Sequence, residues 1–135
     1  MNSPYGQTAY QETSVLSASP ERLVPLLYQH LVANLKRGAN CVRNNDVEGK
    51  FENLTRASDI VAELLSALDF EAGGELAGRL ASLYGFWTNE ISKAGREMSA
   101  DRLDRVAQMV GSLHESWQEA ARMVEASGGA PEPVQ

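Results

Sequence analysis

The chain has few of the residues that build disulfide frameworks, metal centres and redox motifs. It contains one cysteine, Cys41, and two histidines among 135 residues. A single cysteine excludes an internal disulfide and any paired-cysteine motif. Di-iron sites in helical bundles need a glutamate three residues before each histidine, but that position holds Leu27 before His30 and Gly111 before His114. We therefore expect no metal and no cofactor.

The chain also lacks a basic block, a long apolar run and a recognisable catalytic motif. Twelve Lys and Arg, scattered along the sequence, stand against eighteen Asp and Glu, which argues against nucleic acid or an anionic membrane as the main partner. Uncharged stretches of the helical part, such as residues 80–89, are shorter than the roughly 20 residues that span a bilayer. "MNSPYGQTAYQ" does not resemble a secretory signal. We expect a cytoplasmic protein that is not an enzyme and does not insert into membranes.

Apolar residues recur with helical spacing along most of the chain, and no segment alternates with the period of a strand. Ser19 and Pro20 mark the start of the first predicted helix, which "RNND" ends. Pro25 lies about one turn inside this helix and predicts a kink or a slightly later start. The predicted core stripe of this helix comprises Val24, Leu27, Leu31, Leu35, Ala39 and Val42.

Three further helices follow. Asp46 is the expected N-cap of the second, Asp69 to Gly74 the turn before the third, and the third ends near Gly95. Ser99 or Asp101 caps the fourth. The predicted core stripes are Val47, Phe51, Leu54, Ser58, Val61, Leu65 and Leu68 in the second helix, Leu76, Leu80, Leu83, Trp87, Ile91 and Ala94 in the third, and Leu103, Val106, Val110, Leu113, Trp117, Ala120 and Val124 in the fourth.

The short connections between these helices predict an all-α fold, an antiparallel up-down four-helix bundle over residues 19–126. Residues 1–18 are expected to form an extended or partly helical N-terminal segment, flexible or docked on the bundle. Residues 127–135 are small, polar and rich in Gly and Pro, and are expected to form a disordered tail.

More apolar residues are present than the four stripes need. At about 100° per residue, Ile60 and Leu64 lie on one flank of the second stripe, Phe86 and Met109 lie off the centres of the third and fourth, and Tyr84 lies on the opposite shoulder from Phe86. A wide apolar face accounts for any one of them. Together they predict a groove or patch on the order of several hundred Å², suited to an amphipathic helix or an extended apolar peptide.

Five segments that form or border the predicted helices follow one another in a specific order and spacing. They are "YGQTAY", "SASPERLVPLLY", "NNDVEGKFENLTRASDIVAELLSALD", "GGELAGRLASLYGF" and "RLDRVAQMVGSLHESWQEA". From the first segment to the last they extend over residues 5–120. In these segments the chain resembles the flagellar secretion chaperone family (FliS).

The resemblance implies a cytoplasmic export chaperone with a helical-bundle fold. Such a protein binds the C-terminal segment of flagellin, prevents its premature polymerisation and delivers it to the flagellar type III secretion apparatus. The implied further partners are an export-gate component or a co-chaperone. The resemblance also places the tyrosines of the N-terminal segment near the flagellin site, which that segment can occlude. The candidate partner-binding residues are Tyr5, Tyr10, Ile60, Leu64, Leu68, Tyr84, Phe86 and Met109.

An alternative interpretation needs no flagellin. The same apolar patch could mediate self-association in a structural or regulatory helical-bundle homo-oligomer. For the chaperone, a monomer or weak homodimer is expected.

Overall fold

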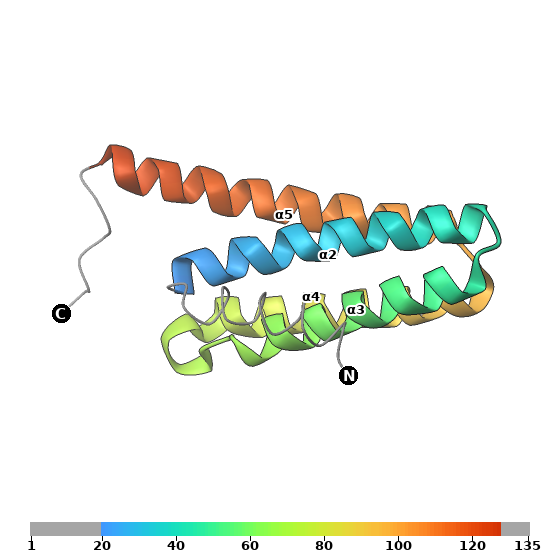
Figure 1. Ribbon diagram of the computed structural model, residues 1–135. Coiled ribbons are helices and arrows are strands. Elements are labelled where there is room, and N and C mark those ends of the chain that lie inside the picture. The colour runs from blue at the N-terminus through green and yellow to red at the C-terminus, as the bar shows by residue number, and fades with distance from the viewer. Residues whose placement is uncertain (1–19, 128–135) are drawn as a thin grey trace, which may run out of the picture.

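Four helices make up nearly all of residues 20–127, the part of the chain that the computed structural model describes (Figure 1). They are α2 (Pro20–Arg43), α3 (Val47–Ser66), α4 (Phe70–Glu97) and α5 (Ala100–Ala126). Within that range no strand is present. The expectations for residues 1–18, which include Tyr5 and Tyr10, for Ser19 at the start of the first helix and for residues 128–135 lie outside the described residues.

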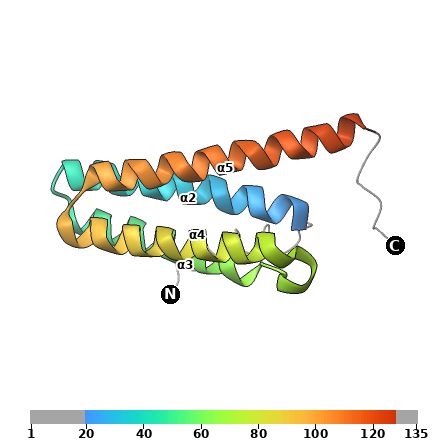
Figure 2. The ribbon, with the colours of Figure 1, turned by 180° about the vertical axis from the view of Figure 1, so that it is seen from behind.

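The helices form the predicted antiparallel up-down four-helix bundle. In both views α2 and α5 lie on one side of the bundle and α3 and α4 on the other (Figure 2). Each helix packs against its two neighbours around the bundle, while α2 and α4 lie diagonally opposite each other. The linkers, residues 44–46, 67–69 and 98–99, are too short to allow any other order.

Polar side chains cap the N-termini of α3, α4 and α5. The Asp46 carboxylate accepts a hydrogen bond from the Gly49 N–H at 3.0 Å, and the Ser99 hydroxyl caps α5 by accepting from the Arg102 N–H. Both N-caps confirm the sequence prediction, and of the two candidates for α5 the N-cap is Ser99 and not Asp101. Each satisfies an N–H that has no partner within its own helix.

The predicted turn from Asp69 to Gly74 is wrong in its extent. Asp69 caps a first helical turn by accepting from the N–H groups of Glu71 and Ala72, so α4 already begins at Phe70. Gly74 then breaks the helical geometry with φ 52° and ψ −126°, a conformation that side chains disfavour. The chain therefore changes direction at Gly74, inside α4.

The later start that Pro25 predicted for the first helix is also wrong. Helix α2 begins at Pro20 and contains Pro25. The proline lacks the N–H that would bond to the Glu21 carbonyl, which removes one hydrogen bond close to the helix end. The rest of the helix keeps its ladder, because the loss falls near the first turn.

Helix α3 is rotated relative to its predicted stripe. Leu64 is buried, with 1% of its surface exposed, whereas Leu65 is 43% exposed and Phe51 is 69% exposed. Helix α3 approaches α2 closely, since a Cβ atom on Gly38 would lie only 2.7 Å from Cδ2 of Leu54. The face that packs inward comprises Leu54, Ala57, Val61 and Leu64.

Helix α4 differs from its predicted stripe at four positions. Ala77 and Tyr84 are buried, while Leu76 is exposed and Leu83 is partly buried. The Tyr84 hydroxyl is satisfied by a partner on another helix, and that contact allows a tyrosine in the core. The buried residues of this helix are Ala77, Leu80, Tyr84, Trp87, Ile91 and Ala94.

Helix α5 is fully buried only at positions in its first half. Its buried residues lie between Leu103 and Val110, Trp117 is partly buried, and Ala120 is exposed although the sequence placed it in the stripe. Figure 1 shows why, since the last turns of α5 slope away from the other helices.

Candidate partner-binding groove

Polar contacts hold the helices together at the bundle end where α5 begins. Arg102 of α5 pairs with Glu90 of α4, with 2.8 Å between Nη1 and Oε1. At the same end Arg43 of α2 pairs with Asp104 of α5, and the Lys50 ammonium of α3 donates to the Gly95 carbonyl oxygen of α4 at 2.9 Å. All ion pairs between different helices within residues 20–127 lie at this end. The opposite end of the bundle is held by apolar and aromatic packing.

An aromatic cluster occupies the middle of the bundle. The Tyr28 and Tyr84 hydroxyls are 2.8 Å apart, and the Trp117 Nε1–H donates to the Tyr28 hydroxyl at 3.1 Å. Tyr28 and Trp87 meet edge to face, with 6.4 Å between ring centroids. Burial raises the pKa of Tyr84 well above its usual value, and the hydrogen bond with Tyr28 raises it further. Burial also raises the pKa of Tyr28, so both tyrosines are neutral at physiological pH.

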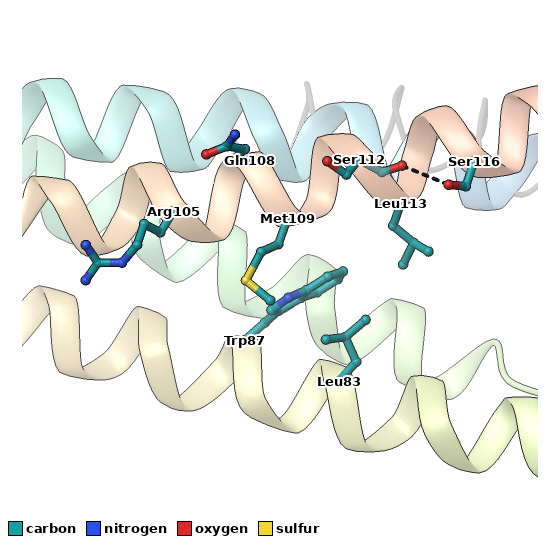
Figure 3. Close-up of a pocket in the computed structure, with 8 residues that line it drawn as sticks. All are labelled: Leu83, Trp87, Arg105, Gln108, Met109, Ser112, Leu113 and Ser116. Carbon is teal, nitrogen blue, oxygen red and sulfur yellow. Dashed lines mark hydrogen bonds between the residues drawn. The ribbon is translucent and has the colours of Figure 1, made fainter.

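Beyond this cluster, α4 and α5 are separated by an open groove of about 620 Å³. Trp87 and Leu83 of α4 point up into it, and Met109 and Leu113 of α5 point toward them (Figure 3). The remaining wall is polar and belongs to α5. The eight lining residues are Leu83, Trp87, Arg105, Gln108, Met109, Ser112, Leu113 and Ser116.

The chemistry of this groove suits a peptide with an apolar face. Side chains of both helices offer aliphatic, thioether and indole surface, while the serines and Arg105 of α5 offer hydrogen bonds. The serines contribute little to holding the wall rigid, since Ser116 donates only to the Ser112 carbonyl of its own helix at 3.2 Å.

A second, smaller pocket of about 310 Å³ lies at the end of the bundle where α3 passes into α4. Leu64 of α3 and Leu68 of the linker between α3 and α4 line it together with Tyr84 of α4 and Trp117 of α5. Val24, near the start of α2, completes its rim, so all four helices contribute.

The structure separates the candidate residues that the sequence grouped into one exposed patch. Leu64 and Tyr84 belong to the core and reach the surface only through the end pocket. Met109 lines the α4–α5 groove and is 37% exposed. Ile60 packs partly buried against the core, and Phe86 is 47% exposed on α4 and lines neither hollow. These residues therefore do not line one common hollow, and partner contact by them stays a prediction.

Sequence reasoning missed the α5 wall of the groove. Arg105, Met109, Ser112 and Ser116 recur at intervals of three and four residues, so they share one face of the helix. Only Met109 stood out, because serines and an arginine on a helix face usually indicate ordinary solvated surface. Trp87 and Leu83 were assigned to the core alone, although they also form the floor of the groove.

Two further features of residues 20–127 bear on the class of protein. No helix there is long and apolar enough to cross a membrane. Nor does this range bring together three or more His, Cys, Asp or Glu side chains in a way that could hold a metal ion.

Fold and site define a four-helix-bundle protein with an apolar groove between two of its helices. Comparison with known proteins identifies the family. The sequence model of the family described as "Flagellar protein FliS" matches residues 1–124. The chain belongs to the FliS family of flagellar secretion chaperones, which confirms the resemblance noted in its sequence.

Individual relatives agree with the family match. The chain is 31% identical to the flagellar secretion chaperone FliS of Campylobacter jejuni over 119 residues, which cover 88% of this chain and 93% of the relative. It is 32% identical to the protein of the same name from Vibrio cholerae over 113 residues, or 81% and 83% of the two chains. The Salmonella typhimurium protein is 31% identical over 109 residues, with 80% and 81% covered.

Proposed function

We propose that this protein is a cytoplasmic export chaperone that binds the C-terminal segment of flagellin, prevents its premature polymerisation and delivers it to the flagellar type III secretion apparatus. The observation that carries this proposal is the family match over residues 1–124, together with a groove that suits a peptide. The chaperone makes and breaks no covalent bond. It acts by covering apolar surface of flagellin until export.

The α4–α5 groove is the site we assign to part of the flagellin segment. It is the larger of the two apolar hollows described above, with about 620 Å³ against about 310 Å³. The end pocket, with Leu64, Leu68 and Tyr84, would take a second part of a long segment. Phe86, exposed on α4, adds apolar contact area outside both hollows.

The energetics favour a long and shallow complex. A flagellin segment that is disordered when free loses conformational entropy on binding. Each Å² of apolar surface that it buries returns about 25 cal/mol, so a large contact area is needed for useful affinity. A shallow footprint also lets the segment leave in steps at the export apparatus.

The test is a calorimetric titration of the full chain with a peptide that carries the flagellin C-terminal segment from the same organism. Saturable binding with a negative heat-capacity change is expected, since apolar surface is buried. A parallel titration uses a chain without residues 1–14, because the resemblance implies that Tyr5 and Tyr10 lie where they can occlude the site. Absence of binding by both chains would refute the proposal.

Sedimentation at several protein concentrations separates the chaperone from a self-associating bundle. The chaperone is expected to sediment as a monomer or a weak homodimer and to form a complex with the peptide. A tight dimer that ignores the peptide would favour the homo-oligomer instead.

A further inference from the structure

One buried hydrogen-bond donor in the α4–α5 groove has no acceptor. The Trp87 side chain is 0% exposed, and its indole Nε1–H has no hydrogen-bond partner within residues 20–127. The second tryptophan is different, since Trp117 donates its Nε1–H to Tyr28. Buried N–H groups are nearly always paired, because an unpaired one has lost its water without compensation. An unpaired N–H in the floor of a groove therefore points to an acceptor that binds there.

Met109 lies on the side of the indole from which such an acceptor would come. Figure 3 shows its side chain extending from α5 toward the edge of Trp87 that carries the nitrogen. A thioether is a weak acceptor, and no hydrogen bond joins the two residues. Methionine is unbranched and adapts its shape at little cost, so Met109 is a cover that can move.

We infer that the segment bound in the α4–α5 groove displaces the Met109 side chain and accepts a hydrogen bond from Trp87 Nε1 through one of its main-chain carbonyl oxygens. This inference rests on the proposed function and assigns a specific contact within it. Trp87 then acts as a polar anchor in an otherwise apolar floor, next to Leu83 and Leu113.

The anchor selects the backbone conformation of the bound segment. In the interior of a helix every carbonyl already accepts from the N–H four residues later, and only its second lone pair is left for a further donor, so an unpaired carbonyl is the better acceptor for Trp87. An extended stretch, or the last turn of a helix, has free carbonyls. The part of the segment beside Trp87 is therefore extended or ends a helix, while apolar side chains on either side fill the groove.

The first experiment follows the indole protons by NMR in the full-length protein. With two tryptophans the chain gives two indole N–H signals, and Trp117→Phe leaves only that of Trp87. Adding the flagellin C-terminal peptide to saturation is expected to move the Trp87 proton downfield, as formation of a hydrogen bond requires. The Trp117 signal, which is already hydrogen-bonded, is expected to move less.

The second experiment changes the cover and leaves Trp87 in place. Met109→Gln has a side chain of similar length whose amide oxygen can accept from Trp87 in the free protein. The peptide must then displace a hydrogen-bonded group, so its affinity is expected to fall about tenfold, while the melting temperature rises. Met109→Leu is the matched comparison, because it keeps an apolar cover without an acceptor, and it is expected to bind the peptide about tenfold more tightly than Met109→Gln does.

The indole signal also shows whether Met109→Gln acts as proposed. In this variant without peptide, the Trp87 proton is expected near the downfield position that it takes in the wild-type complex. Peptide binding with an unmoved Trp87 signal, or equal affinities of Met109→Gln and Met109→Leu, would overturn this inference and leave the proposed function intact. Absence of any binding by the wild-type chain would overturn both.

Discussion

The hydroxyl oxygens of Tyr28 and Tyr84 lie 2.8 Å apart and join two helices that are not neighbours in the bundle. Tyr28 also accepts from Trp117, so one hydroxyl links α2 to both α4 and α5. This link lies between the end of the bundle that carries the ion pairs and the end where α5 slopes away. It limits how far α5 can separate without breaking the core.

Removing the two hydroxyls is expected to cost unequal amounts of stability. Tyr84→Phe removes one hydrogen bond and should lower the free energy of unfolding by about 1 kcal/mol. Tyr28→Phe also leaves the Trp117 N–H without its acceptor, so about 2 kcal/mol is expected. Urea denaturation of both single variants and the double variant measures the two costs and their coupling. Equal costs with strict additivity would contradict the linked arrangement.

The same tyrosines predict a loss of stability at high pH. Burial raises the pKa of both above the usual 10.0, with Tyr84 raised further by its hydrogen bond with Tyr28. Above pH 10 the tyrosines of the unfolded chain ionise while those of the folded chain stay protonated, so stability present below that pH falls as pH rises. Each buried tyrosine lowers the free energy of unfolding by at most about 1.4 kcal/mol for each pH unit above 10.

Denaturation at pH 8 and pH 11 measures this effect. Tyr84→Phe removes one of the two groups, so its loss of stability between the two pH values should be smaller than that of wild type. An equal loss in both proteins would show that Tyr84 is not held protonated by burial.

Two adjacent leucines test the orientation of α3. Leu64 is buried and Leu65 is 43% exposed, which reverses the sequence prediction. Leu64→Ala is expected to lower the free energy of unfolding by about 3 kcal/mol, and Leu65→Ala by less than about 1 kcal/mol. Chemical denaturation compares the same substitution one residue apart. A larger loss of unfolding free energy in Leu65→Ala than in Leu64→Ala would support the predicted stripe and contradict the observed packing.

The break inside α4 predicts opposite effects at two glycines. Gly74 has φ 52°, so Gly74→Ala is expected to destabilise the protein by about 1–2 kcal/mol. Gly78 is the matched control, because its φ is not positive and a Cβ atom there meets nothing within 4 Å. Gly78→Ala is expected to stabilise by up to about 1 kcal/mol through helix propensity. Thermal unfolding of both variants decides the point, and stabilisation by Gly74→Ala would contradict a break there.

The number, order and approximate bounds of the helices were predictable from the sequence because their signals are local. Apolar spacing is a property of each helix alone, and the caps at Asp46 and Ser99 need only the next three residues. The same holds for the antiparallel order, which follows from linker length. The start of α4 was missed because two opposite signals lie within the same few residues. Asp69 is a helix N-cap, whereas Gly74 breaks the helical geometry.

The rotation of the helices and the shape of the site were not predictable in this way. Which flank of α3 faces inward depends on packing against the other helices, where for example Leu54 lies close to Gly38 of α2. Tyr84 can be buried because its hydroxyl is hydrogen-bonded to that of Tyr28. Tyr28 lies 56 residues away in the sequence, so the spacing around Tyr84 does not reveal this partner. The groove, too, arises from the separation of α4 and α5, and hydrophobic spacing within one helix carries no information about it.

Blocking the α4–α5 groove tests the central claim most directly. Ser112→Trp places a bulky side chain in the groove wall, and Ser82→Trp makes the same change at an exposed position of α4 that lines neither hollow. Calorimetric titration of both variants with the flagellin C-terminal peptide is the measurement. The account predicts that Ser112→Trp lowers the affinity at least about tenfold while Ser82→Trp binds like wild type. Wild-type affinity in both variants would show that flagellin does not use this groove.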